Sequence, residues 1–551
     1  MHDIEIPLGK RSKLYRFFEI LPGLLSLSLL LLPIILAVFN PLLAAIFIIV
    51  YTISWIIRAL VLAVRTLQGY SIMRVAEDID WQARLNDLSD PARALGQAAD
   101  DGGKPQYRAA HLANLKRLSG QRYPLPSEII QVVIIATYNE AREVLEPTVQ
   151  SVLSNSFPAK QTILVIGYEA RGPEATRATA RELADQYREH FYAAFAFEHP
   201  SDLPNEVVGK GGNIVYAGRQ LQAWMEKRGV NKEHVIITTL DSDNRPHPSY
   251  LSYLAYEFIV NERRHECAYQ PIALFLNNIW DVPAPMRVLA TGNSFWNMVN
   301  SLRPHMLRNF AAHAQSLVSL EKTDFWSTRT VVEDGHQFWR SYFAFKGQYE
   351  VIPIYVPIYQ DAVLSSTYVK TLKAQFIQLR RWAYGASDVP YVATRVFSRH
   401  REVPLLDGFF KFLRLLDGHV SWATSSIILA FGAWAPLVFA NESNRSIVAH
   451  ELPDLVSYLQ WLGYIGLVLS IFLSMKMLPP RPARYKRRRN LWMILQWALM
   501  PVTSILYGSS AAIYSQTRLL LGKYLDKFDV TDKSVVSQSG SGRVQHTASH
   551  E

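Results

Sequence analysis

The sequence contains a single cysteine, Cys267, so it can form no internal disulfide and no zinc or iron–sulfur site built from cysteines. A lone cysteine is most simply a small buried apolar residue. The histidines of the central region lack the His-x₃-His and His-Glu-x-x-His spacings of helical zinc sites, which makes a zinc enzyme improbable. These histidines are His199, His247, His305, His313 and His336.

Charged residues are also scarce, at 19% of the 551 residues, whereas apolar residues make up 49%. This composition excludes a disordered chain and a coiled coil. Lys and Arg number 57 against 47 Asp and Glu, which gives a net charge of +10. The length leaves room for about three domains. The mean hydropathy of +0.02 fits either one uniform globular protein or a polar domain joined to an apolar one.

The apolar residues are concentrated near the two ends of the chain. Residues 17–64 are almost wholly apolar, and Asn40 and Pro41 divide them into two runs of roughly 20 residues, each long enough to cross a bilayer. A cleavable signal peptide fits less well, because the first run is too long and a second follows at once. We expect segment 1–65 to hold a short tail and two membrane helices. Segment 401–521 holds three more apolar runs, at 419–440, 455–478 and 491–513.

Basic residues in the short flanking segments predict the orientation of these helices. Lys10, Arg11, Lys13 and Arg16 precede the first run, and six basic residues lie between 481 and 489. The positive-inside rule then places the tail and the middle of the chain in the cytoplasm of an integral, multi-pass plasma (inner) membrane protein. Because the basic loop lies between two spans, contact with the lipid bilayer is the better reading and nucleic acid is not expected.

The last apolar stretch, 491–521, leaves two topologies open. About 31 residues are too few for two full crossings, but Pro501 and Gly508 allow a broken, re-entrant hairpin that returns the C-terminus to the cytoplasm. A simple fifth span with an external tail is the alternative. We favour the hairpin. The remaining segment, 522–551, ends in a polar tail that we predict to be disordered.

The middle of the chain has the pattern of an α/β domain. Residues 66–127 are polar and mixed, and we predict a helical connector there. From 128 to 400, short Val- and Ile-rich runs alternate with amphipathic stretches, which predicts a mostly parallel sheet covered by helices. The predicted strands are 129–136, 162–167 and 235–240, and helices are expected at 142–154 and 174–192.

Polar residues follow each predicted strand, where ligands bind in such sheets. Thr137, Tyr138, Asn139 and Glu140 follow the first strand, and Glu169 closes the second. Asp241 and Asp243 follow the third. Two carboxylates at this spacing can turn toward one hard divalent cation, so we predict a Mg²⁺ or Mn²⁺ site that also binds diphosphate oxygens.

Two further segments carry residues suited to group transfer. Glu333 and Asp334 form an acidic pair after an apolar approach. Gln378, Arg381 and Trp382 stand at i, i+3 and i+4 and share one face of a predicted helix. A cation, an amide and a large aromatic suit a phosphate beside a sugar ring. An interfacial helix with Trp and Arg at the headgroup level is the competing reading.

These segments resemble the motifs of the membrane-embedded family 2 glycosyltransferases, which include cellulose and hyaluronan synthases. The resemblance covers about 128–400, and the flanking membrane spans are arranged as in that family. It implies a GT-A (Rossmann-like) cytosolic domain inserted between transmembrane helices. In order, the similar segments are residues 137–140, the Gly-Lys-x-x-Asn segment with Lys210 and Asn213, Asp241 with Asp243, Glu333 with Asp334, and Gln378 with Arg381 and Trp382.

The resemblance also implies roles for these residues. Residues 137–140, Lys210, Asn213 and Asp241 would bind the nucleotide sugar, with Asp241 and Asp243 on the metal. Glu333 and Asp334 would be the catalytic pair, with Asp334 as general base. Gln378, Arg381 and Trp382 would contact the acceptor and the diphosphate. The family's Asp pair after the second strand is missing here, and Glu169 either takes its place on the nucleobase or pairs with Arg171 instead.

The implied activity is inverting transfer of a sugar from a nucleotide-sugar donor to a growing polysaccharide. One alternative is a single transfer to a polyprenyl-phosphate lipid, and another is a membrane scaffold with a decayed transferase domain. The sequence identifies neither the sugar nor an export partner. Residues 528–533 resemble the gating loop of cellulose synthases. His313 and four tryptophans are weaker candidates for a sugar path, namely Trp280, Trp296, Trp326 and Trp339.

Overall fold

The computed structural model describes residues 4–7, 9–97, 105–440 and 447–525. Its centre is one eight-stranded mixed sheet in the order β3-β2-β1-β4-β7-β6-β8-β5. Strands β3, β2, β1 and β4 are parallel neighbours, β7 runs antiparallel to β4 and β6, and β6 and β8 are parallel. The strands are β1 (Ile130–Thr137), β2 (Thr162–Glu169), β3 (Ala193–His199), β4 (Val235–Asp241), β5 (Arg245–Pro246), β6 (Cys267–Leu274), β7 (Ala314–Ser316) and β8 (Glu350–Tyr359).

The three predicted strands are confirmed to within two residues, because continuous runs of Val and Ile suit strands buried on both faces. Two apolar cores lie on the two faces of the sheet. Val133 and Ile135 of β1 contribute to one, and Val132 and Ile134 contribute to the other. The covering helices are α6 (Arg142–Leu153), α7 (Glu174–Tyr187), α8 (Lys210–Lys227), α9 (Tyr250–Val260), α10 (Ala284–Ser301), α11 (Leu317–Lys322), α12 (Glu333–Ala344), α13 (Tyr368–Ala383) and α14 (Asp388–Val396).

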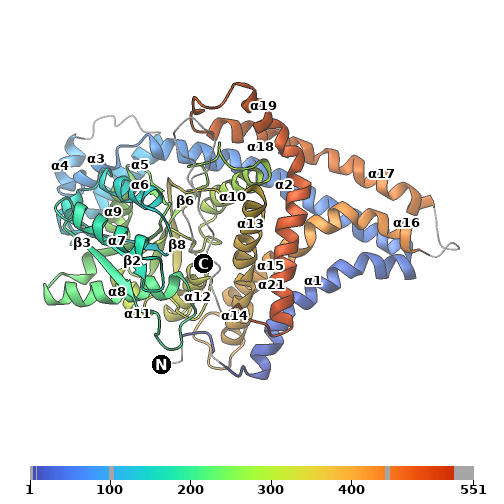
Figure 1. The fold of residues 1–551 in the computed structure, drawn as a ribbon, viewed down its shortest axis with the longest axis horizontal. Coiled ribbons are helices and arrows are strands. Elements are labelled where there is room, and N and C mark those ends of the chain that lie inside the picture. Colours follow the sequence, from blue (N-terminus) through green and yellow to red (C-terminus); the bar gives the residue numbers. More distant parts are fainter. Residues whose placement is uncertain (1–3, 8, 98–104, 441–446, 526–551) are drawn as a thin grey trace.

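Among the described residues, five helical stretches are long and apolar enough to cross a membrane, as the sequence predicts. Four of them extend away from the α/β domain, to the right in Figure 1. These four are α1 (Lys13–Phe39), α2 (Pro41–Glu77), Leu405–Phe439, which comprises α15 (Leu405–Phe431) and α16 (Ala435–Phe439), and His450–Met477, which comprises most of α17 (Ile447–Trp461) and all of α18 (Gly463–Met477).

The last apolar stretch, Arg488–Leu520, is one helical run, and its re-entrant path stays a prediction. It consists of α19 (Arg488–Leu495), a 3₁₀ turn, α20 (Met500–Thr503), a π-helical segment (Ser504–Ser509) and α21 (Ser510–Leu520). Pro501 does not break the run, because it lies in the first turn of α20, where a helix has no hydrogen bond to lose. The π-helical segment accommodates Gly508.

Both ends of this fifth stretch nevertheless contact the α/β domain. Near its start, Arg489 donates to the carbonyl of Trp280 at 2.9 Å. Near its end, Ser515 donates to the carbonyl of Arg380 in α13 at 2.6 Å. Helix α21 therefore runs beside α13 at the edge of the domain (Figure 1). The gating-like residues 528–533 lie outside the described residues.

The connector between the second membrane helix and the domain begins later than predicted. Helix α2 continues twelve residues past 65, to Glu77, because its polar end is still helix-forming and packs on the domain. Three short helices follow, α3 (Trp81–Asp87), α4 (Pro91–Gln97) and α5 (Pro105–Leu118). The ring of Trp81 stacks on Tyr253 of α9 at a centroid distance of 3.5 Å, which attaches the connector to the sheet's outer layer.

Candidate active site

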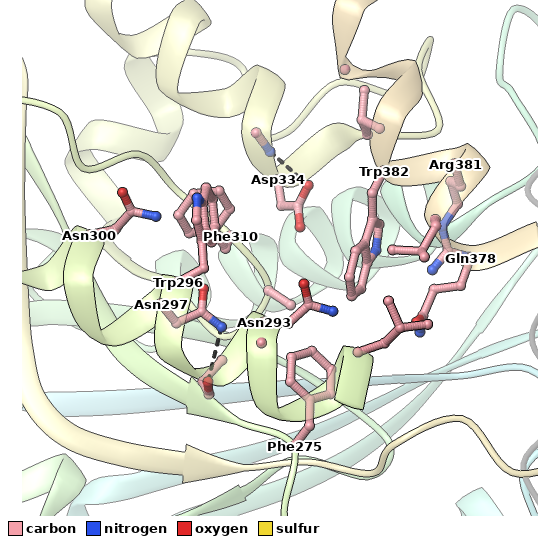
Figure 2. A pocket seen from close by; sticks show the side chains of 18 of the residues that line it. Phe275, Asn293, Trp296, Asn297, Asn300, Phe310, Asp334, Gln378, Arg381 and Trp382 are labelled. Atoms are coloured by element: carbon pink, nitrogen blue, oxygen red, sulfur yellow. Dashed lines mark hydrogen bonds between the residues drawn. The ribbon is translucent and has the colours of Figure 1, made fainter. Parts of the chain in front are cut away.

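One cavity of about 1080 Å³ brings together all of the predicted site residues except Asn139. It begins at the carboxyl ends of β1, β2 and β4 and continues toward α13 and the membrane helices. Figure 2 shows Asp334 on one side of it, with Gln378, Arg381 and Trp382 facing the same space. Segments that are more than 240 residues apart in sequence thus share one site.

The loop after β1 is shaped by Glu140. Its Oε2 accepts hydrogen bonds from the Thr137 hydroxyl at 2.9 Å and from the Tyr138 backbone N–H at 2.9 Å. The Asn139 N–H donates to the same oxygen at 3.3 Å. The carboxylate therefore folds the loop back on itself, which explains why Asn139 does not reach the cavity. The position of Glu140 on the cavity wall remains compatible with a ligand contact.

Asn213 connects the carboxyl ends of β1 and β2 by hydrogen bonds. Its Nδ2 donates to the carbonyl of Gly167 at 3.0 Å and to that of Thr137 at 3.4 Å, and the side chain is buried. A Cβ at position 167 would collide with Asn213 Oδ1, so glycine is required there. The amide oxygen of Asn213 has no hydrogen-bond partner among the described residues. The geometry indicates that Asn213 positions the loop rather than reaching far into the site.

Glu169 has two cationic neighbours. The guanidinium of Arg171 lies 2.6 Å from Glu169 Oε2, and His199 Nδ1 lies 3.1 Å from the same oxygen. The other ring nitrogen of His199 lies 2.9 Å from Glu206. Burial would lower the pKa of His199, but its hydrogen bonds with the two glutamates raise it to about 9. Glu169 does pair with Arg171, and both side chains still line the cavity.

Lys210 begins α8 and forms an ion pair with Asp241 at the end of β4, with Nζ 2.7 Å from Oδ1. Burial would lower the pKa of Lys210, but Asp241, with Glu333 nearby, raises it above its ordinary value. The ammonium group is therefore charged and held at the carboxyl end of the sheet. Gly211 lets α8 approach closely, since a Cβ there would lie 2.5 Å from the Ser327 carbonyl.

Asp243 is buried and held by two donors. The Asp361 N–H donates to its Oδ2 at 3.1 Å, and Asn244 Nδ2 donates to its Oδ1 at 3.4 Å. No cluster of three or more His, Cys, Asp or Glu arranged for a metal occurs in the part of the chain that the structure describes. Asp241 and Asp243 still fit Mg²⁺ or Mn²⁺, because such ions commonly take one or two carboxylates and complete their shell with phosphate oxygens and water.

Glu333 and Asp334 open α12, with Glu333 fully buried and Asp334 half-buried. The Gly335 N–H donates to Asp334 Oδ1 at 2.7 Å. Burial raises the pKa of both carboxyls, and the charge of Asp334 adds to the effect on Glu333. Lys210 and Arg381 oppose the rise at both positions. A carboxylate whose pKa is raised above its ordinary value holds a proton more strongly, which suits a general base.

Helix α13 carries the amide, the cation and the aromatic ring on one face, as predicted. Trp382 packs near Phe275 at a ring-centroid distance of 6.0 Å. Gln378 accepts a hydrogen bond from Gln375 at 3.2 Å. Arg381 is close enough to the acidic pair to lower both carboxyl pKa values. The three side chains form one wall of the cavity opposite Asn293 of α10 (Figure 2).

The weaker sequence candidates divide into two groups. Trp296 and Trp339 line the cavity, whereas Trp280, Trp326 and His313 are not among its described lining residues. His313 is buried under β7, where it bonds to the Phe310 carbonyl at 2.8 Å and to Trp326 Nε1 at 2.9 Å. Burial lowers its pKa to about 4, so it is a neutral structural residue.

Sequence reasoning named Trp296 but missed the rest of the cavity wall that α10 forms. Asn293, Trp296, Asn297 and Asn300 lie on one face of this helix and point into the space beside Asp334 (Figure 2). Their i, i+3, i+4 and i+7 spacing was the available signal. It was not recognised, because a face of asparagines and one tryptophan resembles an ordinary polar surface.

Comparison of the sequence with protein-family models and with curated proteins gave no match. Among solved structures, a mannosyltransferase from Pyrobaculum calidifontis in complex with GDP-Man and Mn²⁺ is similar at 16% identity, covering 76% of this chain and 99% of its own, with a TM-score of 0.36. S. aureus TarS 1–349 in complex with UDP is similar at 12% identity, 76% and 96% coverage and a TM-score of 0.34. Scores this low establish no common fold, so the function of this chain rests on its own residues.

Proposed function

We propose that this chain is an inverting membrane glycosyltransferase that moves a sugar from a nucleotide-sugar donor to a growing polysaccharide. The observation that carries the proposal is the buried acidic pair Glu333–Asp334 in the same cavity as the Lys210–Asp241 ion pair and Trp382. This cavity combines a base of raised pKa, fixed positive charge and an aromatic face. The motif order in the sequence supports the same assignment.

Asp334 is the proposed general base. It accepts the proton of the acceptor hydroxyl while that oxygen forms a bond to the anomeric carbon of the donor sugar. The bond between that carbon and the diphosphate oxygen breaks on the opposite face, so the configuration inverts. Burial keeps the pKa of Asp334 raised, the charge of Asp241 adds to this effect, and the proton then leaves from Asp334 to water.

Lys210 and Arg381 stabilise the leaving diphosphate. Both are cations on the cavity wall, and both act on the acidic pair electrostatically, which supports this role. Fixed charge in a site that excludes water lowers the barrier without reorganisation at the moment of reaction. When Mg²⁺ or Mn²⁺ is bound, Asp241 and Asp243 hold it and it supplies Lewis acidity to the diphosphate.

The donor and acceptor occupy different walls of the cavity in this proposal. Thr137, Tyr138, Glu140, Glu169 and Arg171 surround the nucleoside at the ends of β1 and β2, with Asn213 holding these strand ends together. Trp382 stacks on the acceptor sugar, and Gln378 supplies an amide beside it. We place the protein in the plasma (inner) membrane with the α/β domain in the cytoplasm, where nucleotide sugars are made.

A second candidate, single transfer to a polyprenyl-phosphate lipid, is favoured by one observation. The cavity wall includes Leu62 of α2, Leu415 of α15 and Leu467 of α18, so it is open to apolar chains between the membrane helices. Product size distinguishes the two candidates.

The test is nucleotide release by the purified full-length protein in nanodiscs, with each common sugar nucleotide and with Mg²⁺ or Mn²⁺. The proposal predicts release with at least one donor and a product of many sugar units. One sugar per lipid supports the second candidate, and no release with any donor contradicts both and leaves the scaffold interpretation.

A further inference from the structure

The cavity extends well beyond the residues that the proposed reaction uses. Along α10 it passes from Asn293 to Asn300 and then to Arg303 in the following loop. Asn293 and Asn300 are seven residues apart on the helix, or about 10 Å along its axis, so this end is distinct from the carboxyl ends of the strands. Figure 2 shows Asn300 on the side of the cavity away from Gln378 and Arg381. We call the region lined by Arg303, Arg308, Trp339 and Arg414 the cationic end.

The cationic end offers hydrogen-bond donors that lack acceptors. Asn300 Nδ2, Arg303 Nε and Trp339 Nε1 are buried and have no partner among the described residues. Buried N–H groups are costly to leave unpaired, so this wall is suited to a ligand rich in acceptor oxygens.

Arg308 is the cation best placed for such a ligand. Its guanidinium lies over the Trp339 ring, 4.6 Å from the centroid. Burial lowers its pKa to about 10, and the positive charge of Arg414 adds to this effect, so it stays charged at neutral pH. Arg303, Arg308 and Arg414 form no ion pair with any residue in the described part of the chain.

The acids near these arginines already have partners. Asp388 raises the pKa of Arg308, but it also accepts a hydrogen bond from His336 at 2.6 Å. Asp407 pairs with Lys411 on its own helix and accepts from the Tyr342 hydroxyl at 2.7 Å. Positive charge and unpaired donors therefore remain on this wall beside Asp388 and Asp407.

We propose that the cationic end binds an anionic group of the acceptor, a phosphate or a carboxylate, while the acceptor hydroxyl lies beside Asp334. Trp339 follows Asp334 by five residues on α12, or about 7 Å along the axis, so one elongated acceptor can reach both. The inference rests on the proposed function and adds that the acceptor is charged. The anionic group can come from either of two sources. One is a polyprenyl diphosphate that carries the sugar, and the other is a uronic acid within the polymer.

Direct binding to the full-length protein in nanodiscs tests the proposal with two pairs of matched probes. Geranyl diphosphate is compared with geraniol, and a hexasaccharide of alternating glucuronate and N-acetylglucosamine is compared with cellohexaose. At least one anionic probe is expected to bind ten-fold or more tightly than its uncharged partner. Binding of the diphosphate only indicates a lipid carrier, and binding of the hexasaccharide only indicates an acidic polymer.

Substitutions of single arginines test whether the anionic probe binds at the cationic end. Arg308→Gln and Arg414→Gln are each expected to weaken the anionic probe at least ten-fold, whereas Arg308→Lys retains most of the binding. Arg399→Gln, which removes an exposed arginine outside the cavity, is the control and leaves binding unchanged. The exposed Arg414 keeps the test available if Arg308→Gln does not fold.

Three results overturn the proposal. The first is equal affinity for charged and uncharged probes, and the second is unchanged binding in both arginine variants. The third is loss of binding in Lys210→Met with full binding in Arg308→Gln, which assigns the anion to the donor site. Nucleotide release is measured in parallel. Its absence with every donor rejects the proposed function and leaves the anion site standing, so the two failures are distinguishable.

Discussion

Lys210 Nζ lies 2.7 Å from Oδ1 of Asp241, which joins the first turn of α8 to the carboxyl end of β4. This pair connects two motifs that are 31 residues apart and fixes a cation beside Glu333 and Asp334. The charge is thus in place before a donor arrives. This preformed ion pair explains why α8 begins with a lysine, directly after a glycine.

Replacing Lys210 by methionine should reduce the rate of nucleotide release about 10²- to 10³-fold, because one fixed charge on the leaving group is lost. Lys232→Met is the matched control, since Lys232 is exposed and pairs with Glu321 outside the cavity. Steady-state kinetics with a coupled nucleotide assay measures both variants. Equal rates in the wild type and Lys210→Met would remove Lys210 from the mechanism.

In the pH–rate profile, activity should rise on the acid side at a higher pH than the ordinary pKa of an aspartate would give. Burial raises the pKa of the Glu333–Asp334 pair, and the base works only when deprotonated, so activity rises as pH rises through the raised value. Because Lys210 lowers both pKa values, Lys210→Met should move the limb to higher pH. A limb that stays in place in this variant contradicts the electrostatic coupling.

His199 should contribute stability that depends on pH. Its pKa is raised to about 9 in the folded state, against about 6.5 unfolded. The contribution is therefore fully present below about pH 6.5 and is lost as pH rises through 9. His199→Gln should lower the melting temperature at pH 6.5 and much less at pH 10, as measured by thermal unfolding. An equal loss at both pH values would show that only packing is involved.

Asn213→Ala should lower the free energy of unfolding by about 1–3 kcal/mol, because two buried strand-end carbonyls lose their donor. Chemical denaturation measures the change. Gln220→Ala, on the same helix but with an exposed side chain, is the control. If Asn213→Ala alters only the donor KM and leaves stability unchanged, Asn213 is a direct ligand rather than a positioning residue.

Glu169 offers a test of its two interpretations. If it contacts the nucleobase, Glu169→Gln should raise the donor KM about ten-fold and leave kcat nearly unchanged, because the lost interaction is made equally in the ground and transition states. If Glu169 only pairs with Arg171 and His199, stability falls and the KM does not change. Kinetics and thermal unfolding on the same preparation separate the outcomes.

The sequence predicted the elements whose signal is local. The strands of β1, β2 and β4 are continuous Val and Ile runs, and their polar ends meet because parallel strands share an edge. The end of the predicted helix 174–192 was wrong by five residues, since the chain turns after Tyr187 to enter β3. When tertiary pairing rather than local composition ends a helix, the sequence contains little signal for the position of that end.

Other features depend on contacts between distant segments and could not be predicted. The antiparallel insertion of β7 between β4 and β6 rests on a three-residue strand. The path of Arg488–Leu520 beside α13 follows from packing partners rather than from its apolar length. Arg308 belongs to no motif, and only its position over Trp339 shows that it faces the cavity.

The most direct test of the central claim is a comparison of the wild type with Asp334→Asn, measuring nucleotide release and donor binding together. The substitution preserves size and removes the base, so release should fall at least 10²-fold while donor affinity stays within about three-fold. Release at the wild-type rate, or loss of donor binding in a folded variant, would contradict the assignment of Asp334 as the base of a sugar transfer.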